Sequence, residues 1–347
     1  MTMKTPQKII SLLAGSALFA ASFMNAATTD VVGYTTTTLP AGAGNLFAPA
    51  FVNNNSFMGV LTGAAAGPDS TLTLSGTMTA AAFNESSDVA GVSKGYPLYY
   101  LEVLNDTNAS DSIDTEGLII DIVSNSTSGV VVAADTSTLG IQGDEQIAIR
   151  KHLTLGDVFS GSTGLTSFTD AITIYNEDGP GTAVTHVPDG AGGFLLNSDF
   201  VTGSTDAPIY PGTGLAIANV ALLTIVPTGV VKESDTQVAI YGNSVVNIIS
   251  VLKPISNVVL SSDGRLNEAM EDFTDVVTQY SSDGSLLPVV PSGASQPGFV
   301  DDGSGGFLSS DFSTPVSVTV DGSSEAFAVG STGDRVYKIS GTVITQN

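Results

Sequence analysis

Cysteine and tryptophan are both absent from this sequence of 347 residues, and histidine occurs only twice. Without cysteine, no disulfide can stabilise the fold and no thiol can act as a nucleophile. Stability must therefore come from a buried core or from assembly. The composition allows such a core, because 42% of the residues are hydrophobic and only 13% are charged.

Basic residues are also scarce, with 10 Lys and Arg against 34 Asp and Glu and a net charge of −24. They are scattered, and Arg150 and Lys151 form the only adjacent pair. Nucleic acid is therefore excluded as a partner, because binding a polyphosphate requires clustered cations. The same charge repels an anionic membrane surface. Solubility outside the cell is the simplest explanation of the acidity, and cation binding is the alternative.

One long apolar run stands at the amino terminus. Lys4 and Lys8 precede the apolar residues 9–23, and small residues follow. This is the layout of a secretory signal peptide, and we expect cleavage after Ala26 or Ala27. A buried amino-terminal helix is the alternative. The run is too short to span a membrane, so no membrane span is expected after cleavage.

Short runs rich in β-branched and aromatic residues fill the remaining chain, separated by Gly, Asn, Asp, Ser or Pro. Alternation within them, as in residues 146–150, predicts strands with one buried face, and the spacing is typical of a sandwich or barrel. We therefore expect an all-β fold. Two short helices are predicted at 153–159 and 266–273, with Thr154 and Asn267 as caps. The predicted strands are 96–104, 117–123, 129–134, 145–150, 171–175, 215–225, 237–241, 245–252, 316–320 and 335–344.

The chain contains an internal repeat. Residues 168–179 (FTDAITIYNEDG) recur as 273–284 (FTDVVTQYSSDG) with seven matches in twelve positions, and a second similarity follows in the same order. The repeat unit is as long as a domain. The further similarities relate 189–200 to 302–312 and, more faintly, 31–34 to 230–233 and 44–47 to 242–245.

The repeat predicts two related β-sandwich or barrel-like modules with extra N-terminal strands. The expected boundaries are 1–26 for the signal peptide, 27–143 for an N-terminal β-rich region, and 144–228 and 229–347 for the two modules.

The repeated residues have a structural interpretation. Gly179 and Gly284 follow Asp in Asp-Gly steps, which supply the positive φ of hairpin turns. Asp170 and Asp275 are expected to bond their own backbone in turns, while the repeated aromatic residues fill the module cores. The alternative is that matching Tyr and Asp residues form two equivalent ligand sites.

Three ordered segments resemble a known family. They are 99–103 (YYLEV), 117–126 (GLIIDIVSNS) and 146–159 (QIAIRKHLTLGDVF). They are similar to the YY-E, I-x-S-N and TLGxLF segments of a verrucomicrobial paralogous family of secreted, uncharacterised proteins. The resemblance covers most of the chain after the signal peptide. This sequence differs from the family in having no tryptophan, which such proteins contain. It implies a secreted β-rich protein and carries over no catalytic residues.

Catalytic patterns are few. A serine hydrolase would have to use His152 or His186, and the nearest approach to G-x-S-x-G, at 293–297, ends in Pro. Two separated histidines form no H-E-x-x-H motif, and we expect both to be surface or strand residues. Paired carboxylates for glycoside hydrolysis remain an alternative, since an acidic chain offers many pairs.

An acidic loop resembles part of a calcium site. Oxygen-bearing side chains alternate along it, as a hard cation requires. The sixth position is Asp111 instead of Gly, and the twelfth is Gly117 instead of Glu, which favours a solvated hairpin loop as the alternative. The candidate calcium ligands are Asp106, Asn108, Ser110 and Asp114.

The sequence thus predicts a secreted, non-catalytic structural or interaction protein of the cell envelope or extracellular matrix. Expected partners are envelope or matrix proteins, polysaccharide, or further copies of the chain. A carbohydrate-binding module is one alternative and a glycan-active enzyme with paired carboxylates another. The aromatic candidates for exposed sugar-binding residues are Tyr96, Tyr99, Tyr100, Tyr175, Tyr210 and Tyr280.

Overall fold

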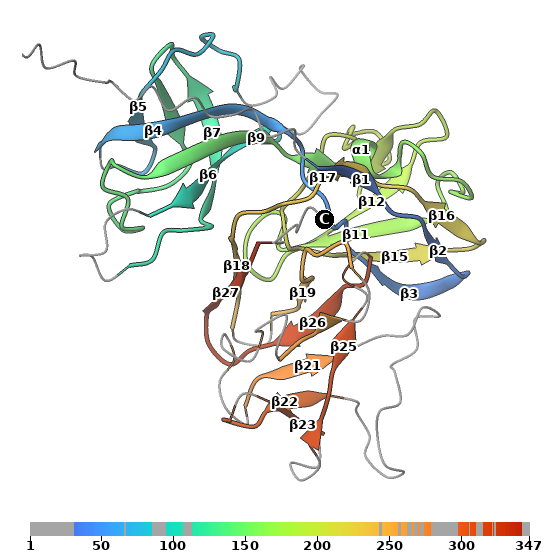
Figure 1. Cartoon of the computed structure of the whole chain (residues 1–347). Coiled ribbons are helices and arrows are strands. Elements are labelled where there is room, and N and C mark those ends of the chain that lie inside the picture. The colour runs from blue at the N-terminus through green and yellow to red at the C-terminus, as the bar shows by residue number, and fades with distance from the viewer. Residues whose placement is uncertain are drawn as a thin grey trace, which may run out of the picture. The chain divides into compact units, whose positions relative to one another are not determined.

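The computed structural model of the protein (Figure 1) describes residues 31–341 apart from several gaps. The predicted signal peptide lies outside the described residues. The gaps are 66, 85–94, 107–112, 243–244, 256–257, 262–265, 267–269, 271–273, 279–297, 305, 310–314, 321 and 323.

A closed barrel of six strands occupies one part of the chain, in the order β4-β5-β8-β7-β6-β9. Strand β5 shows why these segments close on a core, because Leu72 and Leu74 are buried while Thr71 and Thr73 are exposed. The strands are β4 (Asn55–Ala65), β5 (Ser70–Leu74), β6 (Tyr99–Asn105), β7 (Ile119–Asn125), β8 (Gly129–Val132) and β9 (Gln146–Lys151). The core includes Leu61, Leu72, Leu101, Val103, Ile122, Val130, Val132, Ile147 and Ile149.

A first open sheet has the order β13-β12-β11-β15-β3. Strands β3 and β15 lie side by side in Figure 1 although they are far apart in sequence, and Phe47 pairs with Leu215. The strands are β3 (Gly42–Phe47), β11 (Ala171–Tyr175), β12 (Ala183–Pro188), β13 (Phe194–Leu196) and β15 (Leu215–Asn219). Two-stranded pairs join β1 (Val32–Tyr34) to β17 (Thr228–Val230), β2 (Thr37–Leu39) to β16 (Leu223–Ile225) and β10 (Leu153–Thr154) to β14 (Pro208–Ile209).

A second open sheet has the order β19-β26-β21-β22-β23-β24. Its core packs Phe299, Phe307, Phe327 and Tyr337 against aliphatic side chains. The strands are β19 (Asn247–Ile249), β21 (Val276–Thr278), β22 (Phe299–Asp301), β23 (Phe307–Ser309), β24 (Pro315–Val316) and β26 (Phe327–Gly330). Two further pairs join β18 (Thr236–Ile240) to β27 (Arg335–Ile339) and β20 (Val258–Val259) to β25 (Thr319–Val320).

The two open sheets share a strand order. Five strands of the first, β13-β12-β11-β15-β3, correspond in order to β23-β22-β21-β26-β19 of the second. The register agrees as well, because Asn45 pairs with Ile217 in one sheet and Asn247 pairs with Val329 in the other. This register relates residue 45 to residue 247, whereas the sequence comparison related 44–47 to 242–245.

Strand pairing crosses the predicted boundaries. Strand β3, from the predicted N-terminal region, belongs to the first open sheet, and β9, from the predicted first module, closes the barrel. The barrel is therefore an insertion between β3 and β10. The sequence similarity locates the repeated strands. It does not specify which distant strand pairs with each of them.

The all-β prediction is confirmed, since strands dominate the described residues. Helix α1 (Leu155–Phe159) is also present, starting two residues later than predicted. Its capping box is complete, because Thr154 Oγ1 accepts from Asp157 N at 3.1 Å and Asp157 Oδ2 accepts from Thr154 N at 3.2 Å. Most of the second predicted helix, 266–273, lies outside the described residues.

The turn at Gly179 gives a first prediction. Its φ is +111° and a Cβ there would meet no atom within 4 Å, so only backbone strain opposes a side chain. Gly179→Val should lower the free energy of unfolding by about 1 kcal/mol or more, measured by urea denaturation. Gly330→Val is the control, because that glycine also has open space but no positive φ. Equal effects would contradict the strain argument. The equivalent Gly284 lies outside the described residues.

Candidate functional site

A cavity of about 420 Å³ is lined by residues from the barrel and both open sheets, and we call it the junction cavity. Its volume is in the range of about 300–1,000 Å³ that is typical of small-molecule sites. Aliphatic side chains make up much of its wall, and Glu177 is the only charged residue among those described there. The lining residues are Leu118, Ile119, Ile174, Tyr175, Asn176, Glu177, Gly179, Tyr210, Pro211, Thr213, Gln237, Val238, Ala239, Tyr241, Asn247, Ile248, Ile249 and Val336.

Three tyrosines line this cavity, namely Tyr175, Tyr210 and Tyr241. Two of them, Tyr175 and Tyr210, were among the sequence candidates for sugar binding. Tyr241 was missed, although it directly follows strand β18, as Tyr210 directly follows β14. The expectation of exposure was wrong for Tyr96 and Tyr100, which are buried. Tyr99 is half-buried, and Tyr280 lies outside the described residues.

Tyr210 is held rigidly. Its hydroxyl donates to Asp121 Oδ2 at 2.5 Å, and its ring lies 4.7 Å from the His152 ring, centre to centre. Burial and the adjacent Asp121 carboxylate raise the pKa of Tyr210 far above its ordinary value. The phenol therefore stays protonated, and its ring presents a fixed face to the cavity.

Both histidines are fully buried. The prediction of a surface or strand residue holds for His186, which lies in strand β12, and is wrong for His152, which lies between β9 and β10. His152 Nε2 lies 3.0 Å from Asp121 Oδ1, and His186 Nε2 lies 2.8 Å from Glu177 Oε2. In the described part of the chain, the Nδ1 atom of neither ring has a hydrogen-bond partner. Neither imidazole is therefore hydrogen-bonded to a serine hydroxyl there, as a nucleophile and its base would be. The two pairs instead fix the carboxylates beside the cavity wall.

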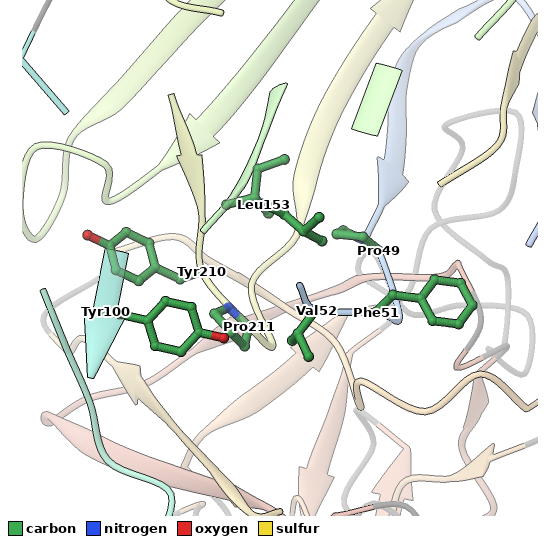
Figure 2. Close-up of a pocket in the computed structure, with 8 residues that line it drawn as sticks. Pro49, Phe51, Val52, Tyr100, Leu153, Tyr210 and Pro211 are labelled. Atoms are coloured by element: carbon green, nitrogen blue, oxygen red, sulfur yellow. The ribbon is translucent and has the colours of Figure 1, made fainter. Parts of the chain in front are cut away.

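The wall is supported from behind by a packed crevice, shown in Figure 2. Tyr100, Val52 and Pro211 approach one another there, and the crevice leaves no room for a water molecule. Tyr210 and Pro211 belong to both the crevice and the cavity. Their positions on the wall are thus fixed by close packing behind them.

A cluster of buried charges lies elsewhere, where barrel residues meet the segment after β17. Glu102 Oε2 accepts from Arg150 Nε at 2.7 Å, and Glu102 Oε1 lies 2.5 Å from Lys232 Nζ. The Glu102 and Lys232 side chains are both 0% exposed. Ser234 also donates to Glu102, and Lys232 donates to the carbonyls of Ser234 and Asp235. The Glu102 carboxylate is therefore paired with two cations, and Lys232 has two backbone carbonyls as further acceptors.

The pKa of Glu102 reflects this compensation. Burial by itself raises the pKa of a carboxyl, but Lys232 and Arg150 outweigh it and hold the pKa of Glu102 below its usual value. Nothing in the sequence pattern indicated this cluster. Lys232 follows the apolar residues Val230 and Val231 and precedes Glu233, a pattern that is equally compatible with an exposed lysine.

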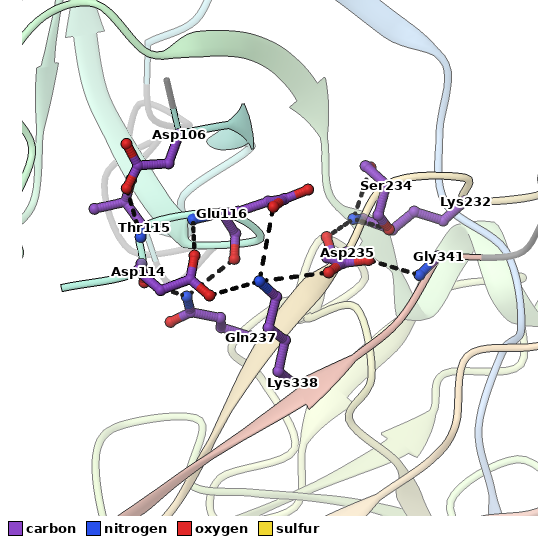
Figure 3. A network of polar contacts seen from close by, with 10 residues as sticks. All are labelled: Asp106, Asp114, Thr115, Glu116, Lys232, Ser234, Asp235, Gln237, Lys338 and Gly341. Atoms are coloured by element: carbon purple, nitrogen blue, oxygen red, sulfur yellow. Dashed lines mark hydrogen bonds and ion pairs between the residues drawn. The ribbon is translucent and has the colours of Figure 1, made fainter. Parts of the chain in front are cut away.

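Asp114, one of the candidate calcium ligands, and the neighbouring Glu116 lie beside Lys338 (Figure 3). Lys338 Nζ is 2.7 Å from Asp114 Oδ2, 3.4 Å from Asp235 Oδ2 and 3.8 Å from Glu116 Oε2. Partial burial lowers the pKa of Lys338, but the three carboxylates, Asp114 foremost, raise it overall. A protein cation thus already neutralises part of this acidic group.

The four candidate calcium ligands are only partly described. Asp106 Oδ2 accepts from Thr115 N at 3.3 Å, and Asp114 Oδ1 accepts from Glu116 N at 3.1 Å. Asn108 and Ser110 lie outside the described residues. Among the residues that are described, no group of three or more His, Cys, Asp or Glu has the geometry of a metal site.

The fold and cavity define an all-β protein in which a closed barrel is inserted into the first of two similarly ordered sheets. Comparisons with protein families, curated proteins and solved structures find no match to this chain. In the part of the chain that the structure describes, no helix has the length and apolar character to cross a membrane.

Proposed function

We propose that the protein is exported and acts as a non-catalytic structural or interaction protein of the cell envelope or extracellular matrix. The amino-terminal segment, the net charge of −24 and the resemblance to a secreted verrucomicrobial family support export. Expected partners are envelope or matrix proteins, polysaccharide, or further copies of the chain.

The non-catalytic proposal is supported mainly by the contacts of the buried ionisable groups, which pair with one another within the protein. Glu102 forms ion pairs with both Arg150 and Lys232, which lie in distant segments of the chain. His152 and His186 each orient a carboxylate through one ring nitrogen. These groups stabilise strand pairing and support the wall of a cavity, which is the design of a binding scaffold.

Export has a direct test. Mass spectrometry of the protein isolated from its native cells should show a chain starting at Ala27 or Thr28, in the envelope or extracellular fraction. The native mass of the same sample shows whether copies associate. Recovery of the intact Met1 start in the cytoplasmic fraction would overturn the proposal.

Carbohydrate binding is the second candidate, and the junction cavity favours it. Aromatic rings with a polar hydroxyl suit a ligand that has both apolar faces and hydroxyl groups, and three tyrosines line the cavity. Binding to a glycan array would support this candidate. A glycan-active enzyme is the remaining alternative and requires that turnover be lost when a carboxylate such as Glu177 is changed to its amide.

We also propose that calcium binds the loop that contains Asp106 and Asp114. Millimolar calcium at a site of roughly ten-micromolar affinity would add about 2.7 kcal/mol to the free energy of unfolding, measured by denaturation. Magnesium at equal ionic strength should add much less, because its small octahedral shell suits such a loop poorly. The double variant Asp106→Asn, Asp114→Asn should abolish the difference. If calcium and magnesium stabilise the parent equally, the ions only screen its charge and the loop is not a calcium site.

A further inference from the structure

The junction cavity brings together three tyrosines from separate segments. Tyr175 ends β11, Tyr210 follows β14 and Tyr241 follows β18. Tyr210 is anchored through Asp121 at 2.5 Å, so its ring needs no reordering when a ligand arrives. The hydroxyls of Tyr175 and Tyr241 have no hydrogen-bond partner among the described residues, although both lie at the cavity. They are available to a ligand.

Other polar groups on the wall are neutral. Gln237 Nε2 donates to the carbonyls of Asp114 at 2.8 Å and Glu116 at 3.0 Å, which leaves Oε1 as an acceptor. Thr213 Oγ1 donates to the Tyr210 carbonyl at 2.7 Å and still has lone pairs. Between these groups stand aliphatic side chains such as Val238 and Ile248. The wall thus alternates apolar patches with uncharged hydrogen-bonding groups.

The charge of the wall limits the ligand further. Glu177 is its only ionisable carboxyl, and no Lys or Arg is found among the described lining residues. The Glu177 carboxylate already pairs with His186 Nε2 at 2.8 Å, so an anionic ligand would find no Lys or Arg to pair with on the described wall, inside a chain whose net charge is −24. A purely apolar ligand would leave the two tyrosine hydroxyls without partners.

We propose that the junction cavity binds a neutral saccharide unit, with sugar C–H faces against Tyr175 and Tyr210 and sugar hydroxyls bonded to Tyr241, Thr213 and Gln237. This inference rests on the carbohydrate-binding candidate and assigns its site. Because the wall includes Ile119 from the barrel, Tyr175 from the first open sheet and Val238 near the second, the bound sugar contacts all three.

Isothermal titration calorimetry of the full chain after signal removal tests the proposal. The probes are cellobiose, maltose, mannobiose and N,N′-diacetylchitobiose as neutral disaccharides and digalacturonate as the acidic one. At least one neutral probe should bind, and at least about tenfold more tightly than digalacturonate. No binding of any neutral probe, or a preference for digalacturonate, would overturn the proposal.

Variants then locate the site. Tyr175→Ala should weaken the best neutral probe at least about fivefold through loss of aromatic contact. Ala239→Trp places a large ring at an exposed lining position of strand β18 and fills the cavity, so it should abolish binding. Tyr34→Ala is the matched control, because Tyr34 is 71% exposed and outside the cavity. Melting temperatures verify that each variant is folded.

Glu177→Gln tests the charge argument separately. This variant should narrow the preference for the neutral probe over digalacturonate at least about fivefold, since the amide no longer repels an acid. If the parent binds neutral sugars but Tyr175→Ala and Ala239→Trp bind as tightly, the site is wrong while carbohydrate binding stands. Cell fractionation tests export independently of either result.

Discussion

Replacing Lys232 by methionine is expected to lower the free energy of unfolding by about 3–5 kcal/mol, measured by urea denaturation. The substitution preserves side-chain length but removes the cation that lies 2.5 Å from Glu102 Oε1. Glu102 is 0% exposed, so its charge would lose one of two compensating partners without gaining water.

A second variant separates lost charge from lost packing. In the double variant Glu102→Gln, Lys232→Met the buried carboxylate is gone, and Arg150 keeps an acceptor in the amide oxygen. Because the buried Arg150 guanidinium is then left without a carboxylate, this variant should be less stable than Lys232→Met, whereas a cost that came from packing alone would leave the two variants equal. Lys338→Met is the surface control and should cost at most about 1 kcal/mol, because its ion pairs are partly exposed. If Lys232→Met and Lys338→Met cost the same, the buried cluster does not stabilise the fold.

The same cluster makes the free energy of unfolding depend on pH. The pKa of Glu102 is lower in the folded state than its unfolded value of about 4.3, so the unfolded state binds more protons in acid. The stabilisation is complete above that unfolded value and is lost as the pH falls through the lower, folded pKa. Stability should thus decline more steeply below about pH 4 in the parent than in Glu102→Gln.

Asp170→Ala is expected to cost about 1–3 kcal/mol of unfolding free energy, because it leaves two partly buried backbone N–H groups without their acceptor. Asp170 is 0% exposed and accepts from Thr166 N at 2.7 Å and Val220 N at 2.9 Å. It thereby joins the turn before β11 to the end of β15. The loss can be measured by urea denaturation.

Asp275 is the equivalent of Asp170 in the second repeat, and its substitution should have a similar effect on stability. It is 1% exposed and accepts from Thr332 N at 3.0 Å and Ser331 Oγ at 3.0 Å, just after β26, which corresponds to β15. Asp275→Ala should therefore cost a similar amount, while Asp69→Ala, at an exposed position, should change stability by less than about 0.5 kcal/mol. Unchanged stability with altered ligand binding would instead favour two equivalent ligand sites.

Local features of the fold were predictable where a short pattern is sufficient. Thr154 caps α1 as expected, because a threonine three residues before Asp157 can form a capping box within one turn. Gly179 has the positive φ that its Asp-Gly step predicts. Strand β11 has the predicted bounds, since alternation and β-branched residues mark it unambiguously.

Other strands had too weak a local signal. Strand β4 was missed because Gly59, Gly63 and two alanines give it low strand propensity. It forms because β5 and β9 supply hydrogen-bond partners on both of its edges. The burial of His152 was also missed, because its partner Asp121 lies on a strand that sequence spacing does not bring near.

The sequence by itself determined the absence of disulfides, the acidic balance, the β class and several turns, because composition and side-chain period depend only on neighbouring residues. The tertiary structure decided the insertion of the barrel, the pairing of β3 with β15, the Glu102 and Lys232 contact, and the three tyrosines of the junction cavity. Glu102 and Ser234, for example, are 132 positions apart. Contacts over such separations depend on how the whole chain packs, and a local sequence pattern does not specify that packing.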